Sequence, residues 1–352
     1  MVNELIPPFD FQQHVIDVWK YSPFGQDGWG WRALMGFLVI AACGLVGNFL
    51  ILRRMSLIGD AISHSALLGI VVVFMITHPL GGPAMMLGAL VAGLVTVGLI
   101  ELIHKTSRVK QDAAIGIAFT SLFALGVVLI HTQISDAHLD ADCVLYGDFM
   151  HVGRHFSNVQ LPDTIADSLR SAGLIDEAIL SGNNLSLPPA EICQMALVAM
   201  LVAALLLIFY KELLVSSFDP ALALSLGINA TALHIALMSI LSIVVVSAFD
   251  AVGAILVIAM LILPGATGHL LSQRLPVILW ITIAFALLSS VLGLHMAIWM
   301  DCNIAAAMVV AGAVLFIIAW ILSPHDGPIA KLRARRASLE KTPEAMEAEI
   351  AG

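Results

Sequence analysis

Nine long apolar segments constrain the fold of this chain more than any other feature. A helix of about 20 mostly apolar residues crosses the hydrocarbon core of a bilayer, and within lipid a helix satisfies its own backbone hydrogen bonds. The sequence therefore predicts an all-α polytopic membrane protein with about nine transmembrane helices. They cover approximately residues 33–52, 57–77, 84–103, 113–131, 195–210, 232–249, 251–270, 277–294 and 304–322.

The composition supports this class and excludes others. Hydrophobic residues make up 60% of the chain and charged residues only 12%, whereas soluble globular proteins carry about 25% charged residues. The net charge of −9 is opposite to the basic surface that nucleic-acid binding needs, so we expect no nucleic-acid partner. The cysteines lack the spacing of a zinc site, and their pairing stays open: Cys43, Cys143, Cys193 and Cys302.

The distribution of Lys and Arg predicts the orientation. With the N-terminus outside and the C-terminus in the cytoplasm, twelve of the 16 basic residues fall on inner segments, as the positive-inside rule requires. We therefore expect an external N-terminal segment, a membrane domain and a cytoplasmic tail, with membrane lipid as a partner. Their bounds are 1–32, 33–323 and 324–352, and the membrane domain includes an external loop at 132–190 and an internal loop at 211–231.

The external loop is rich in acidic residues and histidine. It could attract cations or dock a binding protein, or it could be an ordinary solvated loop. Apolar residues recur at helical spacing within residues 161–179, which predicts short amphipathic helices on the membrane surface.

An acid and a histidine stand four residues apart near the start of the second span. Asp60 and His64 would share one face of a helix. Because a charge within a span is costly, we expect this face to meet protein or a water path. A carboxylate oxygen with an imidazole nitrogen suits manganese, zinc or ferrous iron. Alternatively, Asp60 is an interfacial acid paired with Arg53 or Arg54, and His64 bonds to a neighbouring helix.

The internal loop contains the start and stop signals of a short helix. Asp219 is a suitable N-cap followed by proline at the first helical position, and Gly227 is a suitable stop. These residues predict a helix over about 220–226. On the residues alone, a simple linker helix is the plainer interpretation.

Two features mark the seventh predicted span. Asp250 stands at its outer end, and Pro264-Gly265 should interrupt it, since proline removes a backbone donor. Broken helices often line ion sites, so Asp250 is a candidate entry ligand or a headgroup-level acid. The kink could equally face lipid.

The sequence contains no nucleotide-binding or hydrolytic motif. A phosphate loop of the G-x-x-x-x-G-K-[ST] form is absent. We therefore expect a transport subunit that is not an enzyme, with any ATP hydrolysis on a separate chain.

Three ordered motifs resemble the ABC-type manganese/zinc/iron permease family, over most of the chain. The first is Arg-Arg-Met-Ser-Leu-Ile-Gly-Asp-Ala-Ile-Ser-His-Ser at residues 53–65. The second is Ser-Phe-Asp-Pro at 217–220 with Ala223 and Gly227. The third is Ala-Val-Gly-Ala-Ile-Leu-Val at 251–257, continuing to Pro-Gly-Ala-Thr at 264–267.

This resemblance implies the ABC importer permease fold and the membrane subunit of an ATP-driven importer of manganese, zinc or iron. It implies a bacterial inner or plasma membrane, a separate ATPase, an extracytoplasmic metal-binding protein and a second permease chain, identical or paralogous. No cofactor is held permanently, because the metal is the cargo. Asp60 and His64 would form the ion path, and Phe218, Asp219, Pro220, Ala223 and Gly227 the segment that couples to the ATPase.

Two alternatives stay open. A secondary-active metal transporter would show matched broken helices in two halves, and only one proline-glycine break is present. An ABC importer of a larger metal chelate would share the fold type, but the Asp60–His64 pair favours a bare ion.

Overall fold

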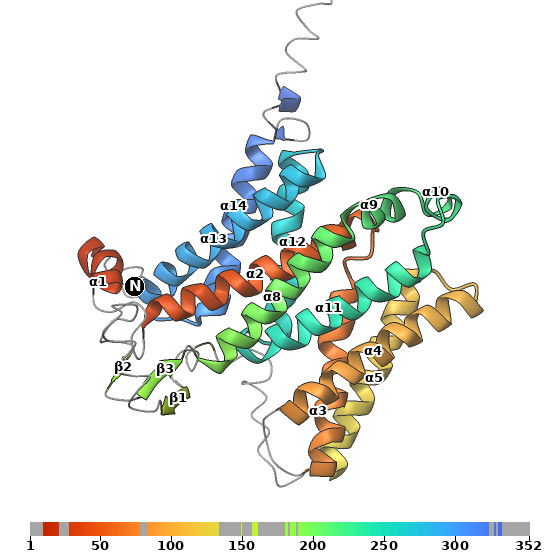
Figure 1. The fold of residues 1–352 in the computed structure, drawn as a ribbon, viewed down its shortest axis with the longest axis horizontal. Helices are drawn as coiled ribbons and strands as arrows, with labels where there is room; N and C mark the ends of the chain where they lie inside the picture. Colours follow the sequence, from red (N-terminus) through yellow and green to blue (C-terminus); the bar gives the residue numbers. More distant parts are fainter. Residues whose placement is uncertain are drawn as a thin grey trace, which may run out of the picture.

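The computed structural model describes residues 10–20, 28–77, 83–133, 149, 157–160, 180–181, 184–187, 189–323, 327–328 and 330–332. Most of this is helix (Figure 1). The helices are η2 (Gln12–Ile16), α1 (Asp17–Lys20), α2 (Trp29–Leu52), α3 (Ile58–Thr77), α4 (Pro83–Thr106), α5 (Gln111–Gln133), α8 (Ala190–Ile208), α9 (Tyr210–Phe218), α10 (Pro220–Ser225), α11 (Ala230–Val252), α12 (Ala254–Leu271), α13 (Leu275–Met300) and α14 (Ile304–Leu322).

Each of the nine predicted spans has a helix, and eight are long enough to cross a membrane. The ninth, α12, is shorter: it has 18 residues, or about 27 Å at 1.5 Å per residue, against a hydrocarbon core of about 30 Å. The fifth predicted span begins earlier than expected, because α8 starts at Ala190. The polytopic all-α prediction is confirmed.

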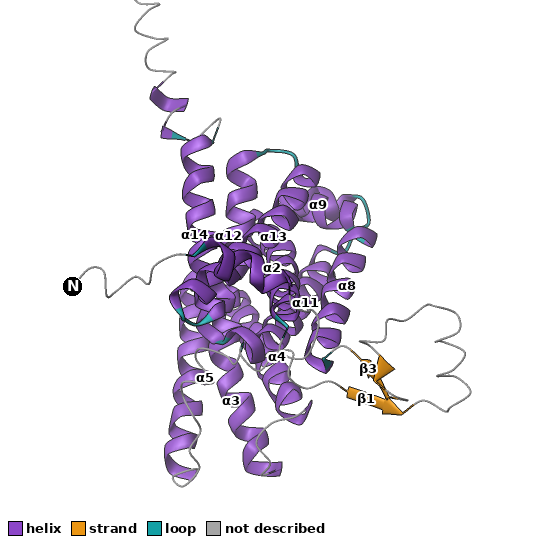
Figure 2. Ribbon diagram, turned by 90° about the vertical axis from the view of Figure 1, so that its left-hand side faces the viewer, coloured by secondary structure: helices purple, strands orange, loops and turns teal. Residues whose placement is uncertain are grey.

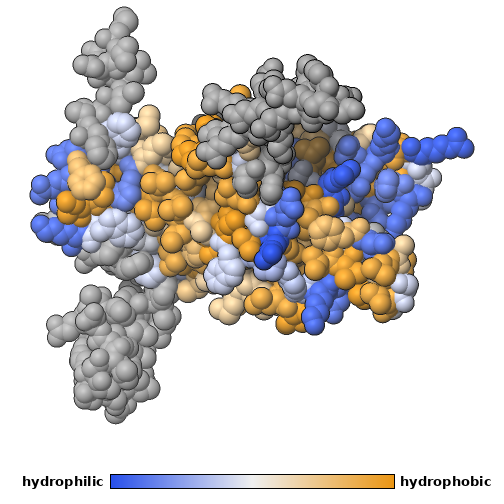
Figure 3. Space-filling view, turned by 90° about the horizontal axis from the view of Figure 1, so that it is seen from above, coloured by the Kyte–Doolittle hydropathy of each residue, from blue (hydrophilic) through white to orange (hydrophobic). Residues whose placement is uncertain are grey.

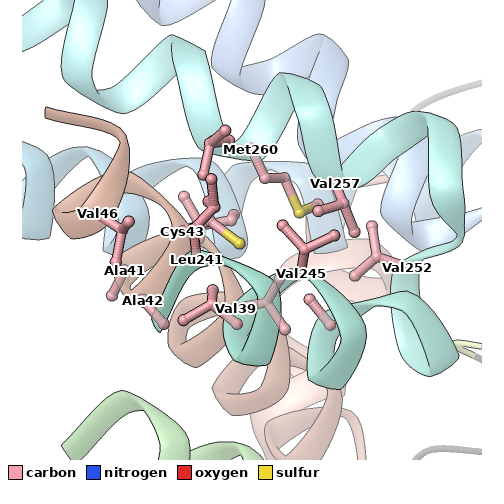
Figure 4. Packing of buried hydrophobic residues seen from close by; sticks show 14 of the residues in the cluster. Val39, Ala41, Ala42, Cys43, Val46, Leu241, Val245, Val252, Val257 and Met260 are labelled. Carbon is pink, nitrogen blue, oxygen red and sulfur yellow. The ribbon is translucent and has the colours of Figure 1, made fainter. Parts of the chain in front are cut away.

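Helix α2 lies at the centre of the bundle. It packs against α12 and α13 on one side and against α8 and α11 on the other (Figure 1). Its spanning window is 78% buried, more than that of any other spanning helix in the described residues. A helix that is apolar all round is buried all round, and α2 fits this rule. Figure 4 shows Val39 and Cys43 of α2 meeting Leu241 and Val245 of α11 and Met260 of α12 in the core.

Helices α3, α4 and α5 form a second group, packed on one another and joined to the rest through α11 and α12 (Figure 1). Where α3 crosses α4, two glycines face each other. A Cβ atom placed on Gly69 would lie 2.0 Å from the carbonyl oxygen of Gly88 and 2.8 Å from Ala92 Cβ. Small residues allow such close backbone approach in membrane helices, so this contact fixes the crossing of α3 and α4.

Replacing Gly69 by alanine should therefore force α3 away from α4. We expect Gly69→Ala to cost about 1–3 kcal/mol of stability, as overpacking does, and to lower the Tm of the detergent-purified protein. Gly98→Ala, on α4, is the control, because nothing lies within 4 Å of its added Cβ. Equal Tm values for the two variants would contradict the close crossing.

The structure corrects the prediction that Pro264-Gly265 interrupts the seventh span, because α12 continues through both residues. The proline packs against α2 at a glycine: a Cβ on Gly44 would lie 2.8 Å from Pro264 Cβ. The chain breaks instead at Gly253, which has a φ of 82° and separates α11 from α12. Asp250 therefore belongs to the last turn of α11 and not to the start of α12.

A small antiparallel sheet, which the sequence did not predict, lies in the connection between α5 and α8. Its strands are β1 (Ser157–Gln160), β2 (Leu180–Ser181) and β3 (Asn184–Leu187), in the order β1-β3-β2. Ser157 pairs with Leu187 and Leu180 with Leu185. The sheet stands to one side of the helices, near the start of α8 (Figures 1 and 2). The surface helices predicted over 161–179 lie outside the described residues.

The surface of the bundle is largely apolar. In Figure 3, hydrophobic atoms cover much of the described surface between hydrophilic groups gathered at the left and right ends. Large apolar side chains of the spanning helices are exposed on it, including Val91, Val128, Leu207, Trp280 and Val310. Such a surface would be unstable in water and suits contact with lipid.

Candidate metal and coupling sites

Asp60 and His64 form a contacting pair on α3. Asp60 is the third residue of the helix, and its Oδ1 lies 3.1 Å from His64 Nε2. The side chains are 29% and 28% exposed, so the pair lies at a surface of this chain and not within its core. For the alternative in which Asp60 pairs with Arg53 or Arg54, Arg53 instead donates to Ser216 and Ser217 of α9, and the ion pair of Asp60 among the described residues is with His64.

Two aromatic rings of α5 hold the imidazole. Phe119 stacks on His64 with ring centroids 5.8 Å apart and an interplanar angle of 25°. Phe123 meets it edge-on, with centroids 5.6 Å apart. These contacts restrict the ring, so His64 presents its nitrogens in a defined direction beside the Asp60 carboxylate.

The pair offers one oxygen and one nitrogen ligand, and the described residues bring no third His, Cys, Asp or Glu to it. Zinc takes four ligands in most structural sites, and manganese favours octahedral oxygen-rich sites. Within the part of the chain that the structure describes, Asp60 and His64 are therefore at most part of a metal site, whose remaining ligands would lie outside these described residues or on another chain.

The structure does not bring Asp250 to the pair. The starts of α3 and α11 lie side by side, since Ile58, His234 and Met238 line one small pocket. Asp250 comes 16 residues after His234, or about 24 Å further along α11 at 1.5 Å per residue. His64 is only six residues beyond Ile58, about 9 Å. The backbone of Asp250 is thus offset from that of His64 along the helices, and the role of Asp250 as an entry ligand stays a prediction.

The predicted short helix on the internal loop is present as α10. Asp219 Oδ1 accepts hydrogen bonds of 3.0 Å from the backbone N–H groups of Ala221 and Leu222, and Pro220 occupies the first turn. At the other end Gly227 has a φ of 80°, and Ile228 N–H donates to Ala223 O at 2.9 Å. These bonds form a Schellman motif, so both ends of the six-residue helix are capped.

Four large apolar side chains are exposed around α10. Phe218 is 69% exposed and Leu224 is 62% exposed, and Leu222 and Leu226 are also open to the surroundings. They lie at the end of the molecule where α9 and α10 project (Figure 1). Ala223, in contrast, is fully buried. Because Ala223 is buried within its own chain, it would influence an ATPase through the seating of α10, and its coupling role stays a prediction; Leu222 and Leu224 form the outer face.

A polar network that the sequence did not predict joins this end of the bundle. Besides the two serines of α9, Arg53 Nη1 lies 3.3 Å from His234 Nδ1. His234 Nε2 is 3.6 Å from Glu101 Oε2. The other carboxylate oxygen of Glu101, Oε1, lies 2.8 Å from Lys105 Nζ. Partial burial lowers the pKa of Arg53, but a guanidinium stays protonated at neutral pH.

These residues line a pocket of about 380 Å³. From the sequence, Arg53 and Arg54 were possible partners of Asp60 and the start of the first motif, and no contact with α9 or α11 was predicted. The network joins residues from four separate segments, so no local pattern could have found it. The one local signal was the serine pair directly before Phe218-Asp219, whose hydroxyls accept the hydrogen bonds of Arg53.

Membrane-length helices packed round α2, with a short capped helix at one end, define a polytopic membrane protein. The chain matches the ABC 3 transport family over residues 30–157 and 169–323. It belongs to that family.

Relatives support the same assignment. The chain is 38% identical over 311 residues to the manganese transport system membrane protein MntD of Bacillus subtilis, covering 88% of this chain and 97% of that protein. It is 38% identical over 304 residues to the zinc transport system membrane protein TroD of Treponema pallidum, covering 86% of this chain and 76% of that protein. The fold resembles PsaBC from Streptococcus pneumoniae, solved in complex with Fab. Here the TM-score is 0.67 and the identity 28%, and 92% of this chain and 98% of that chain are covered.

Proposed function

We propose that this chain is the membrane permease subunit of an ATP-driven importer of divalent transition-metal ions. The observation that carries the proposal is the contact between Asp60 and His64 on α3. One carboxylate oxygen and one imidazole nitrogen suit manganese, zinc or ferrous iron. The manganese and zinc transport relatives agree with that ligand chemistry.

A second permease chain would complete the metal site. Asp60 and His64 are partly exposed, so a second copy or a paralogue can approach them. Two such chains would supply two carboxylates and two imidazoles round one ion. The metal is bound as cargo and passes on, which agrees with a set of ligands that no single chain completes.

The ATPase would bind at α10. Phe218, Leu222, Leu224 and Leu226 expose apolar surface at the bundle's end, and apolar surface clustered outside lipid marks a protein interface. Because the sequence has no phosphate loop, ATP hydrolysis falls to a separate subunit. An extracytoplasmic binding protein would deliver the metal to the opposite end.

The experiment is reconstitution of the permease with its ATPase and binding protein in liposomes. We expect uptake of manganese, zinc or iron only with hydrolysable ATP, and none with a non-hydrolysable analogue. A permease-only liposome is the control. Uptake driven by an ion gradient in that control, without ATP, would contradict the proposal and favour a secondary transporter.

A further inference from the structure

Arg53 joins the α2–α3 junction to α9 by two directed hydrogen bonds. Its Nη2 donates to Ser216 Oγ at 2.9 Å and its Nε donates to Ser217 Oγ at 3.1 Å. Both serine hydroxyls donate to Leu213 O, one turn earlier in α9. Their oxygens therefore present lone pairs to the guanidinium. The planar fork of arginine suits this two-point contact, which a lysine ammonium cannot reproduce.

The two ends of this link lie close in sequence to the two candidate sites. Ser217 is two residues before Asp219, the cap of α10, and only Asp219 separates α9 from α10. Arg53 is seven residues before Asp60, and a short turn over residues 53–57 leads from α2 into α3. Arg54 in that turn has a φ of 59°, so the turn is tight. A displacement of α10 thus reaches α3 through few intervening residues.

The link also borders an open pocket. Arg53, Glu101, Lys105 and His234 line the pocket of about 380 Å³. A charge left unpaired in a dry interior is strongly destabilising, whereas a guanidinium beside an open pocket can be hydrated when its bonds break. The contact can therefore open and close as the helices move, and His234 offers the guanidinium a second partner on α11.

We propose that Arg53 is the positioning residue that transmits movement of α10 to the Asp60–His64 pair. This inference rests on the proposed function. The contacts of Arg53 with Ser216 and Ser217 hold α9 and the start of α3 in one relative position. Loss of these contacts leaves the ATPase bound to α10 and the metal ligands in place, but separates ATP hydrolysis from transport.

The test measures the number of ATP molecules hydrolysed per metal ion imported by the reconstituted transporter. Arg53→Gln removes the bonds to both serines. Hydrogen bonds to a charged group are stronger than bonds between neutral groups, so we expect their loss to raise the ATP-to-metal ratio about tenfold or more. Co-purification of the ATPase and the amount of permease in the membrane should stay at wild-type values. Arg53→Lys should restore part of the coupling, since one serine stays within reach of a cation.

A second variant acts on the other side of the link and keeps the arginine. The Ser216→Ala/Ser217→Ala double variant should raise the ATP-to-metal ratio as Arg53→Gln does. Combining all three changes should add little, because contacting partners are non-additive. Arg54→Gln, which removes the same charge one residue away, is the matched control and should couple normally.

Three results would overturn the inference. The first is a wild-type ATP-to-metal ratio in Arg53→Gln. The second is that the arginine and serine changes have additive effects on this ratio. The third is that uptake falls only in proportion to the loss of permease or of bound ATPase. Each requires that the wild-type transporter imports metal with ATP. If the wild type itself does not, the proposed function fails, and that result is distinguishable from a failure of the link alone.

Discussion

Asp60→Asn and His64→Gln should each abolish metal uptake while the protein stays in the membrane. Asp60→Asn keeps the shape of the side chain and removes its charge, and His64→Gln keeps a neutral polar side chain and removes the imidazole nitrogens that would bind the ion. Loss of a group that only supports a metal ligand costs roughly 10–100-fold in affinity, so loss of a ligand should cost at least that. Both side chains are partly exposed, so folding should be little affected.

The measurement is uptake of radioactive manganese or zinc into cells that lack other importers, with permease levels checked by immunoblot. Asp112→Asn is the matched control. Asp112 stands in the first turn of the neighbouring helix α5 and is exposed, but glycine occupies the position four residues later. Transport at the wild-type rate by both Asp60→Asn and His64→Gln would remove the pair from the ion path.

Leu224→Asp should detach the ATPase. Leu224 is 62% exposed on α10 beside two other exposed leucines, and a carboxylate there would have to be desolvated when the ATPase covers this face. We expect loss of co-purification of the ATPase and of ATP-driven uptake. Leu332→Asp introduces the same charge at a leucine that is 60% exposed outside α9 and α10, and it should bind the ATPase normally.

Two further changes separate the surface of α10 from its support. Ala223→Trp should act by unseating the helix, because Ala223 is fully buried. Asp219→Ala removes the cap, at about 0.5–2 kcal/mol of helix stability. If Leu224→Asp retains the ATPase while Ala223→Trp loses it, then α10 positions another surface and is not itself the docking site.

The sequence predicted the features that depend on local spacing. Apolar length located the spans, the four-residue interval placed Asp60 beside His64, and Asp219-Pro220 predicted the start of α10. Contacts between segments that are distant in the sequence could not be predicted from local spacing. Spacing could not tell which face of a six-residue helix is buried, so the burial of Ala223 was not predicted.

Pro264 shows the same limit for a residue that is a strong local signal. Proline usually disrupts a helix interior, yet α12 continues through it. Gly44 of α2 leaves room for the ring, and that room is visible only once α2 and α12 are packed together. The Arg53 network was likewise hidden, because its members come from α4, α9, α11 and the turn after α2.

The central position of α2 has a consequence for synthesis in the cell. Asn48 of α2 is fully buried and donates to Thr282 Oγ1 of α13 at 2.9 Å, across 234 residues of sequence. At roughly 5–20 residues per second, a ribosome needs roughly 10 to 50 s to make that interval. Until then the amide can use its bond to Gly44 O, 2.8 Å away on the same helix. The first long helix of the chain must therefore remain in the bilayer, with the amide N–H of Asn48 bonded within the helix, until α13 is made late in synthesis.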